Sequence, residues 1–154
     1  MIGALTIRRM RPADATAVAE LNGQLGYPSA PDEVVERLAA ADGAHGTLLV
    51  AEEDDRVIGW VHVALKASLL EERTAQVMGI VVDASHRGAG VGTRLMAEAE
   101  AWATARGARR LIVGSRVTRE RAHAFYLERG YALHKTSRWF EKRLARHGQP
   151  GPGG

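Results

Sequence analysis

The feature that most constrains the fold is the hexapeptide RGAGVG, from Arg87 to Gly92, which separates two stretches of different periodicity. The preceding stretch TAQVMGIVVD is typical of a strand, and the following stretch GTRLMAEAEAWATARG repeats apolar residues at helical spacing. A short apolar run, ARRLIVGS, then predicts another strand. Residues 74–115 therefore predict a strand–helix–strand crossover, whose two strands should be parallel neighbours.

The rest of the chain predicts a mixed sheet. We expect a strand at 4–10, a helix at 11–26, a second helix that begins with Ser29 or Asp32, and a hairpin at 46–65 that turns at EEDD. A helix at 119–130 and a last hairpin at 131–144 would follow. The predicted fold class is α/β (α+β), with a central twisted sheet of about six to seven strands and about four helices on both faces. One domain would cover 1–145, and 146–154 would be a disordered Gly/Pro-rich tail.

Composition excludes several function classes. The chain has no cysteine, so disulfides, a thiolate nucleophile and cysteine metal sites are excluded. No two histidines share a helix face at the spacing of metal ligands. We therefore expect no metal. The net charge of +3 suggests nucleic-acid binding only weakly, and the 5% aromatic content argues against it. No apolar run reaches the roughly 20 residues of a membrane span, so we expect no membrane association and a cytoplasmic location.

The glycines of RGAGVG favour a phosphate-binding turn. A P-loop is excluded because Thr93 and Arg94 follow the last glycine, where lysine and serine or threonine are required. A dinucleotide fingerprint is excluded because the third glycine and the later acidic residue are missing. What remains is a helix N-terminus whose backbone N–H groups could approach an anion, or a merely flexible turn.

Two segments together carry a family resemblance. The first is IVVDASHRGAGVGTRLM and the second is AHAFYLERGY, and the predicted order of elements agrees over roughly residues 3–144. In this combination the chain resembles the GNAT superfamily of acyl-CoA N-acyltransferases. The resemblance implies acetyl-CoA as the acyl donor and an amine as the acceptor.

The resemblance also implies a donor site. The diphosphate of coenzyme A would meet the backbone of the glycine loop, and the pantetheine arm would pair with the strand before it. Gly79, inside that strand, would mark a bulge that opens the sheet. An asparagine common after the next strand is replaced here by Arg116, so Ser115 or Arg116 would substitute for it, or the contact would be absent. The implied cofactor-binding residues are Ile80, Val81, Val82, Arg87, Gly88, Ala89, Gly90, Val91, Gly92, Thr93 and Ser115.

For catalysis, the resemblance implies Tyr126 as the general acid that protonates the leaving thiolate. The base is less constrained, because the strand before the loop carries no carboxylate. Candidates are Glu72, Glu71, His62 and His123, and we place Glu72 first. The acceptor could be an aminoglycoside, a polyamine, an amino acid or a protein amine.

Two further points stay open in the sequence. A non-catalytic acyl-CoA-binding or regulatory module is the alternative function, disfavoured by the presence of Tyr126. The last predicted hairpin, with Trp139 and Phe140, would offer a surface for a homodimer.

Overall fold

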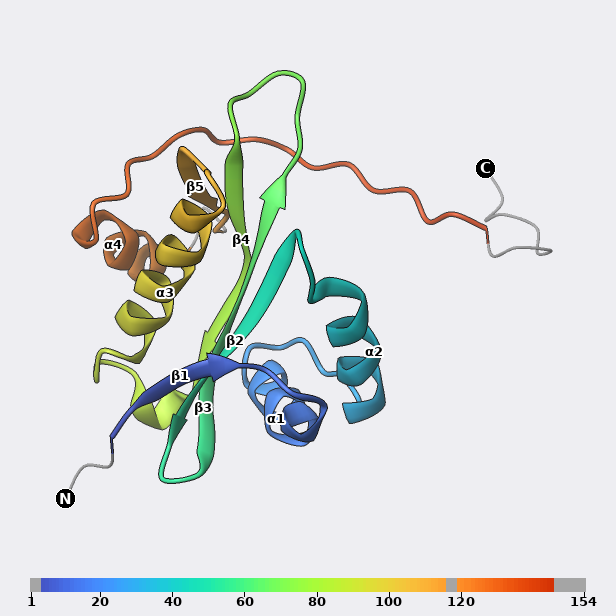
Figure 1. Cartoon of the computed structure of the whole chain (residues 1–154), viewed down its shortest axis with the longest axis vertical. Helices are drawn as coiled ribbons and strands as arrows, with labels where there is room; N and C mark the ends of the chain where they lie inside the picture. Colours follow the sequence, from blue (N-terminus) through green and yellow to red (C-terminus); the bar gives the residue numbers. More distant parts are fainter. Residues whose placement is uncertain (1–3, 116–118, 146–154) are drawn as a thin grey trace. The chain divides into compact units, whose positions relative to one another are not determined.

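The computed structural model describes residues 4–115 and 119–145 (Figure 1). Residues up to Gly114 form one compact unit, and the residues from Ser115 onward form a second. The first unit contains the sheet and three helices, and the second contains α4 (Glu120–Glu128). The single domain expected over 1–145 stays a prediction, and the expected tail at 146–154 lies outside the described residues.

The first unit is built on a five-stranded sheet with the order β1-β2-β3-β4-β5. The strands are β1 (Thr6–Arg9), β2 (Gly46–Glu53), β3 (Arg56–Lys66), β4 (Thr74–Val82) and β5 (Arg110–Val113). Neighbours among the first four are antiparallel, and β4 and β5 are parallel, which confirms the predicted crossover. The EEDD turn is also confirmed. Asp54 and Asp55 have φ values of 50° and 61°, which a tight two-residue hairpin turn requires.

Helices cover both faces of the sheet, as predicted. After a 3-10 turn (Pro12–Asp14), α1 (Ala15–Gln24) and α2 (Pro31–Ala41) pack on one face, mainly against β3 and β2. The other face carries α3 (Val91–Ala105), which packs against β3 and β4 (Figure 1). Side chains of β3 point alternately to these two faces of the sheet. A Cβ on Gly59 would point at Val91 and Leu95 of α3, so Trp60 and His62 point to the α1/α2 face.

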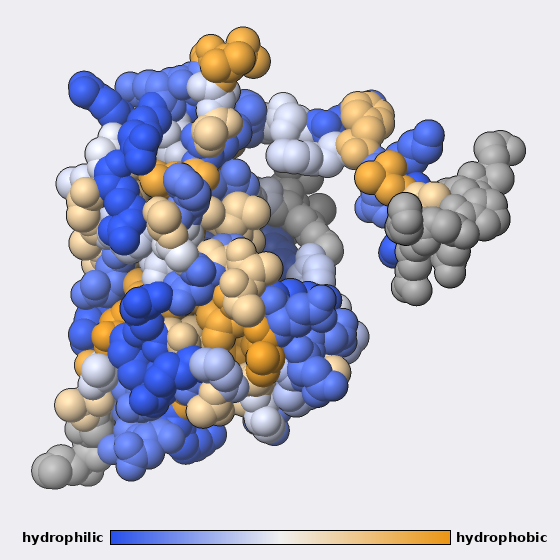
Figure 2. Space-filling view, turned by 45° about the vertical axis from the view of Figure 1, so that its right-hand side comes forward, coloured by the Kyte–Doolittle hydropathy of each residue, from blue (hydrophilic) through white to orange (hydrophobic). Residues whose placement is uncertain are grey.

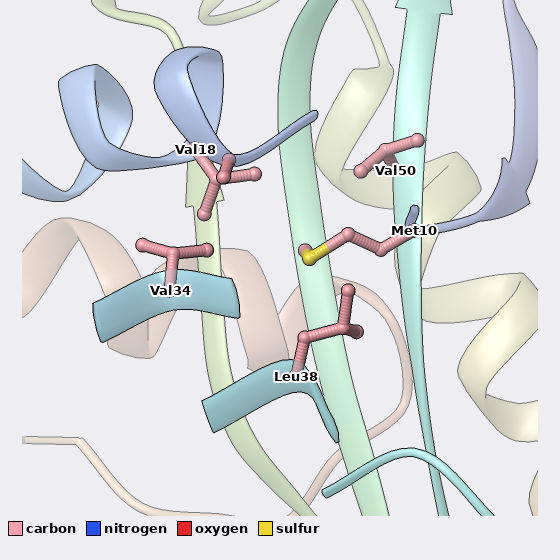
Figure 3. Close-up of a cluster of buried hydrophobic side chains, with 6 residues drawn as sticks. Met10, Val18, Val34, Leu38 and Val50 are labelled. Atoms are coloured by element: carbon pink, nitrogen blue, oxygen red, sulfur yellow. The ribbon is translucent and has the colours of Figure 1, made fainter. Parts of the chain in front are cut away.

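A cluster of buried apolar side chains joins α1 and α2 to the sheet. Figure 3 shows Val18 from α1, Val34 and Leu38 from α2, and Met10 and Val50 from the sheet side pointing toward one another. On the α3 face, Leu95, Met96 and Ala99 are buried. Both helical layers therefore fix the position of β3 and β4, the strands that carry the site.

The structure corrects three expectations. The second helix begins at Pro31, with Ala30 as its N-cap rather than Ser29 or Asp32, and the Ala30 N–H donates to Glu33 Oε1 at 2.9 Å. Helical spacing predicts that Trp102 shares the apolar face of α3 with Leu95 and Ala99, but Trp102 is only half-buried, beneath the Arg106 guanidinium, whereas those two are buried.

The third correction concerns the number of strands. Residues 131–145 form no strand, so the described part of the chain has five strands rather than six to seven. Trp139 and Phe140 are exposed. The physical reason is that a two-stranded hairpin is at best marginally stable alone and needs further strands or a helix. The homodimer stays a prediction.

Candidate acyl-donor site

The first element of the site is an open edge on β4. The parallel pairing of β4 with β5 runs from Thr74–Arg110 to Val77–Val113 and stops there, while β4 stays paired with β3 as far as Val82. Residues 79–82 therefore have a strand on one side only, within the described part of the chain. Since Asp83 N–H donates to the Ile58 carbonyl at 2.8 Å, alternation turns the peptide groups of Ile80 and Val82 toward the open edge. Those of Val81 face β3.

A bulge accompanies this opening. His62 is paired with Gly79, but the next residue, Val63, is paired with Val77, so Met78 is an extra residue on β4. Bulges bend a strand and increase its twist. The bulge thus falls directly before Gly79, as the sequence predicted, at the end of the pairing with β5.

Gly79 has a second role in packing. A Cβ at this position would lie 2.9 Å from Trp60 Cη2 and 3.1 Å from Cζ3. Carbon atoms in contact are normally about 3.5–4.0 Å apart, so a side chain here would displace the ring. Trp60 is held in place because its Nε1–H donates to Asn22 Oδ1 at 3.0 Å.

The glycine loop follows β4 after Asp83 and a 3-10 turn (Ala84–His86), and it leads into α3. Gly88 and Gly90 have φ values of 83° and 85°, and Gly90 is the N-cap of α3. Nothing lies within 4 Å of a Cβ added to either residue, so these glycines are required by backbone conformation and not by crowding. The space around them is open to a ligand.

Backbone groups of this loop can bind an anion. The first-turn N–H groups of an α-helix lack carbonyl partners within the helix, and the helix dipole places partial positive charge there. The Ala89 N–H already donates to the His86 carbonyl at 3.4 Å. The Val91 side chain is buried against the sheet, so only its backbone can contact a ligand. Arg87 and Thr93 are exposed.

A polar cluster that the sequence analysis missed holds the loop to α1. Asp83 Oδ1 accepts from Gln24 Nε2 at 3.0 Å, and Gln24 Oε1 accepts from the Ala84 N–H at 3.0 Å. Ser85 Oγ donates to Asp83 Oδ2 at 2.8 Å, and His86 Nδ1 lies 2.9 Å from the same oxygen. Hydrogen bonds from Gln24 and Ser85 lower the pKa of Asp83 to about 2. An aspartate directly after a strand was the only signal in the sequence, because Gln24 is remote along the chain.

His62 and Trp60 line a cavity of about 330 Å³ on the α1/α2 face. His62 is half-buried, and burial lowers the pKa of its imidazole, which favours the neutral form. His62 of β3 is paired with Gly79 of β4, so this cavity reaches the part of β3 that is paired with the open-edged segment of β4.

The two carboxylates considered as bases lie elsewhere in the first unit. Glu72 precedes β4, about 20 Å along the strand from Gly79 at the usual rise per residue. It is exposed, and it lies 3.8 Å from the Arg109 guanidinium. Glu71 is paired with Lys66 at 3.3 Å and Arg110 at 3.2 Å, and these cations lower the pKa of its carboxyl group. The structure does not bring either carboxylate to the bulge.

Tyr126 lies on α4 in the second unit. The side chain is half-buried and makes edge-to-face contacts with Phe125 and Tyr131, at centroid distances of 5.3 Å and 5.9 Å. Burial raises the pKa of its phenol, so the hydroxyl stays protonated at neutral pH. Ser115 also belongs to the second unit and is exposed, and Arg116 lies outside the described residues.

The described residues contain no group of three or more His, Cys, Asp or Glu that could hold a metal ion. None of the helices in that part of the chain is long and apolar enough to cross a membrane. Within the first unit, the groups near the open edge and the loop are backbone amides and the side chains of His62 and His86.

Comparison with known proteins agrees with this geometry. The sequence matches the Acetyltransferase (GNAT) family over residues 13–131. An aminoglycoside N(6')-acetyltransferase type 1 from Stenotrophomonas maltophilia is 34% identical, covering 82% of this chain and 85% of the relative. Among solved structures, the aminoglycoside N-acetyltransferase AAC(6')-Iy in complex with CoA has a TM-score of 0.80 at 21% identity, covering 92% of this chain and 97% of that one. A Trypanosoma brucei acetyltransferase has a TM-score of 0.77 at 22% identity, with coverage of 90% and 99%.

A strand edge left open beside a glycine loop and a helix N-terminus fits an acyl donor with an amide-bearing arm and a diphosphate. Together with the match over most of its length, this shows that the chain belongs to the GNAT family and is an acetyl-CoA-dependent acetyltransferase.

Proposed function

We propose that this protein transfers an acetyl group from acetyl-CoA to a primary amine of a small molecule. The observation that carries the proposal is the backbone from Ile80 to Gly92, where a strand edge not paired with β5 is followed, after a 3-10 turn, by a glycine loop. The 34% identical relative acts on aminoglycosides according to its name, which supports a small-molecule acceptor and makes aminoglycosides the first class to test.

The backbone would hold the donor in two places. The amides of the glycine loop and of the first turn of α3, with the Arg87 guanidinium and the Thr93 hydroxyl, would bind the diphosphate. The peptide groups of Ile80 and Val82 would pair with the amide-bearing arm along the open edge. The peptide groups of Val81 face β3, so this residue would lie beside the arm without pairing with it. Ser115 would add a side-chain contact.

Acetyl-CoA supplies a thioester carbonyl when it is bound. The neutral amine attacks this carbon, so that a C–N bond forms and the C–S bond breaks. A backbone N–H of Ile80 or Val82 would donate to the carbonyl oxygen as negative charge develops there. The departing thiolate must gain a proton, which the Tyr126 phenol would supply, and the amine nitrogen must lose one. Glu72 remains our sequence-based prediction for the group that accepts this second proton.

The test combines binding and turnover. Calorimetric titration with acetyl-CoA should give saturable heat, and mixing with amines should release coenzyme A thiol. The Tyr126→Phe variant should lower turnover at least about tenfold while leaving acetyl-CoA affinity near normal, because only the proton donor is removed. Tyr131→Phe removes the hydroxyl of the neighbouring ring and is the matched control. Folded protein that gives no heat with acetyl-CoA would refute the proposal, and unchanged turnover in Tyr126→Phe would remove that residue's role.

A further inference from the structure

The cavity on the α1/α2 face has an unusual lining for a site that would receive a polycation. Its walls are formed by the two helices and by β2 and β3, and most of the lining side chains are apolar. The lining residues are Met10, Val18, Asn22, Val34, Arg37, Leu38, Ala41, Leu48, Trp60 and His62. None of them carries a carboxylate. We refer to this cavity as the α1/α2 groove; Figure 2 shows apolar surface exposed on the side of the molecule turned forward.

The α1/α2 groove reaches the strand beside the proposed reaction centre. Trp60 and His62 form its wall on β3, and both contact or pair with Gly79 of β4. Ile80, the first residue whose peptide group faces the open edge, follows Gly79 directly. On this face the Trp60 ring lies over Gly79, so the groove meets the strand at Trp60 and His62, beside the first residue of the open edge.

The charges around the α1/α2 groove disfavour a polycationic acceptor. Arg37 and His62 are the only titratable groups in its lining. Arg37 is positive and lies on α2, where Glu33 pairs with it at 3.3 Å on the exposed side. β4 itself carries no acidic residue, and Met78, at the bulge, is exposed. A molecule with several ammonium groups would find no carboxylate among the lining residues, and Glu33, which does not line the groove, already pairs with Arg37.

We propose that the α1/α2 groove binds the acceptor, and that this acceptor is a primary amine with an apolar body whose amino group lies beside His62. This inference rests on the proposed acetyltransferase function and narrows its substrate class. The apolar body is held by the groove walls, and the neutral imidazole accepts the proton that the amine loses, directly or through one water. The lowered pKa of His62 supports this role because an imidazole that is neutral at pH 7 can accept a proton. Glu72 is then not the base.

The first experiment compares 2-phenylethylamine with kanamycin, an aminoglycoside, using acetyl-CoA and thiol release. We expect kcat/KM for 2-phenylethylamine to be at least about tenfold higher, because burying an aromatic body in an apolar groove contributes that much or more. Equal or better turnover of kanamycin would overturn the inference and leave the proposed function intact.

The second experiment fills the α1/α2 groove. Ala41→Leu enlarges the smallest lining side chain, and it should raise KM for 2-phenylethylamine at least about tenfold without changing acetyl-CoA affinity. Ala40→Leu places the same side chain on the exposed neighbouring position of α2 and should behave as the parent protein. Equal effects of the two substitutions would overturn the groove assignment.

The third experiment tests His62. His62→Gln should lower kcat at least about tenfold and remove the inflection that the imidazole gives below pH 6.5 in the pH–rate profile, leaving only the rise due to neutralisation of the amine itself. His45→Gln, at an exposed position, should change neither. A retained inflection below pH 6.5 in His62→Gln would overturn the placement of the amine.

If the protein binds acetyl-CoA but acetylates neither amine, the proposed function fails. Calorimetric titration of 2-phenylethylamine still decides the groove assignment in that case. Binding to the parent protein that is lost in Ala41→Leu supports the groove, and binding that is absent or equal in both overturns it.

Discussion

Replacing Gly79 by alanine tests whether the packing of Trp60 on β4 is as tight as the structure indicates. Gly79 has no positive φ, so alanine meets no backbone penalty at this position. The added Cβ would lie 2.9 Å and 3.1 Å from two carbons of the Trp60 ring. The indole must therefore move by roughly half an ångström or more to restore ordinary contact distances of about 3.5 Å.

The ring cannot move without cost. Its Nε1–H donates to Asn22 Oδ1 at 3.0 Å, and the Asn22 amide in turn donates to Ser29 Oγ at 3.1 Å. Overpacking of this kind costs about 1–3 kcal/mol. Alanine has less conformational freedom than glycine in the unfolded chain, and this offsets about 0.4–1 kcal/mol of that cost. We therefore expect Gly79→Ala to lower the free energy of unfolding by about 1–2 kcal/mol.

The assay is urea unfolding followed by circular dichroism, with an unchanged m-value as the sign that only stability has changed. Gly23→Ala on α1 is the matched control. No atom lies within 4 Å of its added Cβ, and the glycine is exposed, so this variant should gain about 0.5–1 kcal/mol. In a Trp60→Phe background, which removes the carbons that clash, Gly79→Ala should lose most of its cost. Equal stabilities of Gly79→Ala and the parent protein would refute the reasoning.

Three further predictions concern the loop and the base. Gly90→Ala should cost about 1 kcal/mol of stability, since alanine is strained at a φ of 85°, and it should weaken acetyl-CoA binding in calorimetry, whereas Gly43→Ala should do neither. Asp83→Asn should reduce the loss of stability in acid. In the parent protein the carboxylate contributes stability above its ordinary pKa of 3.8, and this contribution is lost as the pH falls through about 2. The urea midpoint of the variant should therefore vary less than that of the parent between these two pH values. Glu72→Ala should keep the parent pH–rate profile if His62 is the base, and a lost acid limb would restore Glu72.

Local signals predicted the parts of the fold that local chemistry determines. The EEDD hairpin followed from two residues suited to positive φ, and the parallel β4–β5 pair followed from the length and periodicity of the crossover. The start of α2 was misplaced because Ser29 and Asp32 are both strong N-cap residues. Ala30 takes the position, with Pro31 supplying the first helical φ and Glu33 accepting the N-cap N–H.

Contacts between distant segments were beyond such signals. Nothing near Asp83 in the sequence points to Gln24, yet its side-chain amide makes two of the hydrogen bonds that hold the loop. The predicted hairpin at 131–144 failed for a related reason. Its residues suit strands, but strand formation depends on pairing partners and burial more than on intrinsic preference.

The choice of base shows most clearly what could not be predicted from the sequence alone. In a regular strand Val77 and Gly79 would lie on the same face, because side chains alternate with a period of two. The extra residue Met78 reverses this alternation, so Val77 is paired with Val63 on the α3 face and Gly79 with His62 on the α1/α2 face. A bulge whose position is set by tertiary pairing thus decides which side chains can reach an amine at the open edge. His62, on a neighbouring strand, is brought to Gly79 by this pairing, whereas Glu72, which is closer to the loop along the chain, lies at the far end of β4.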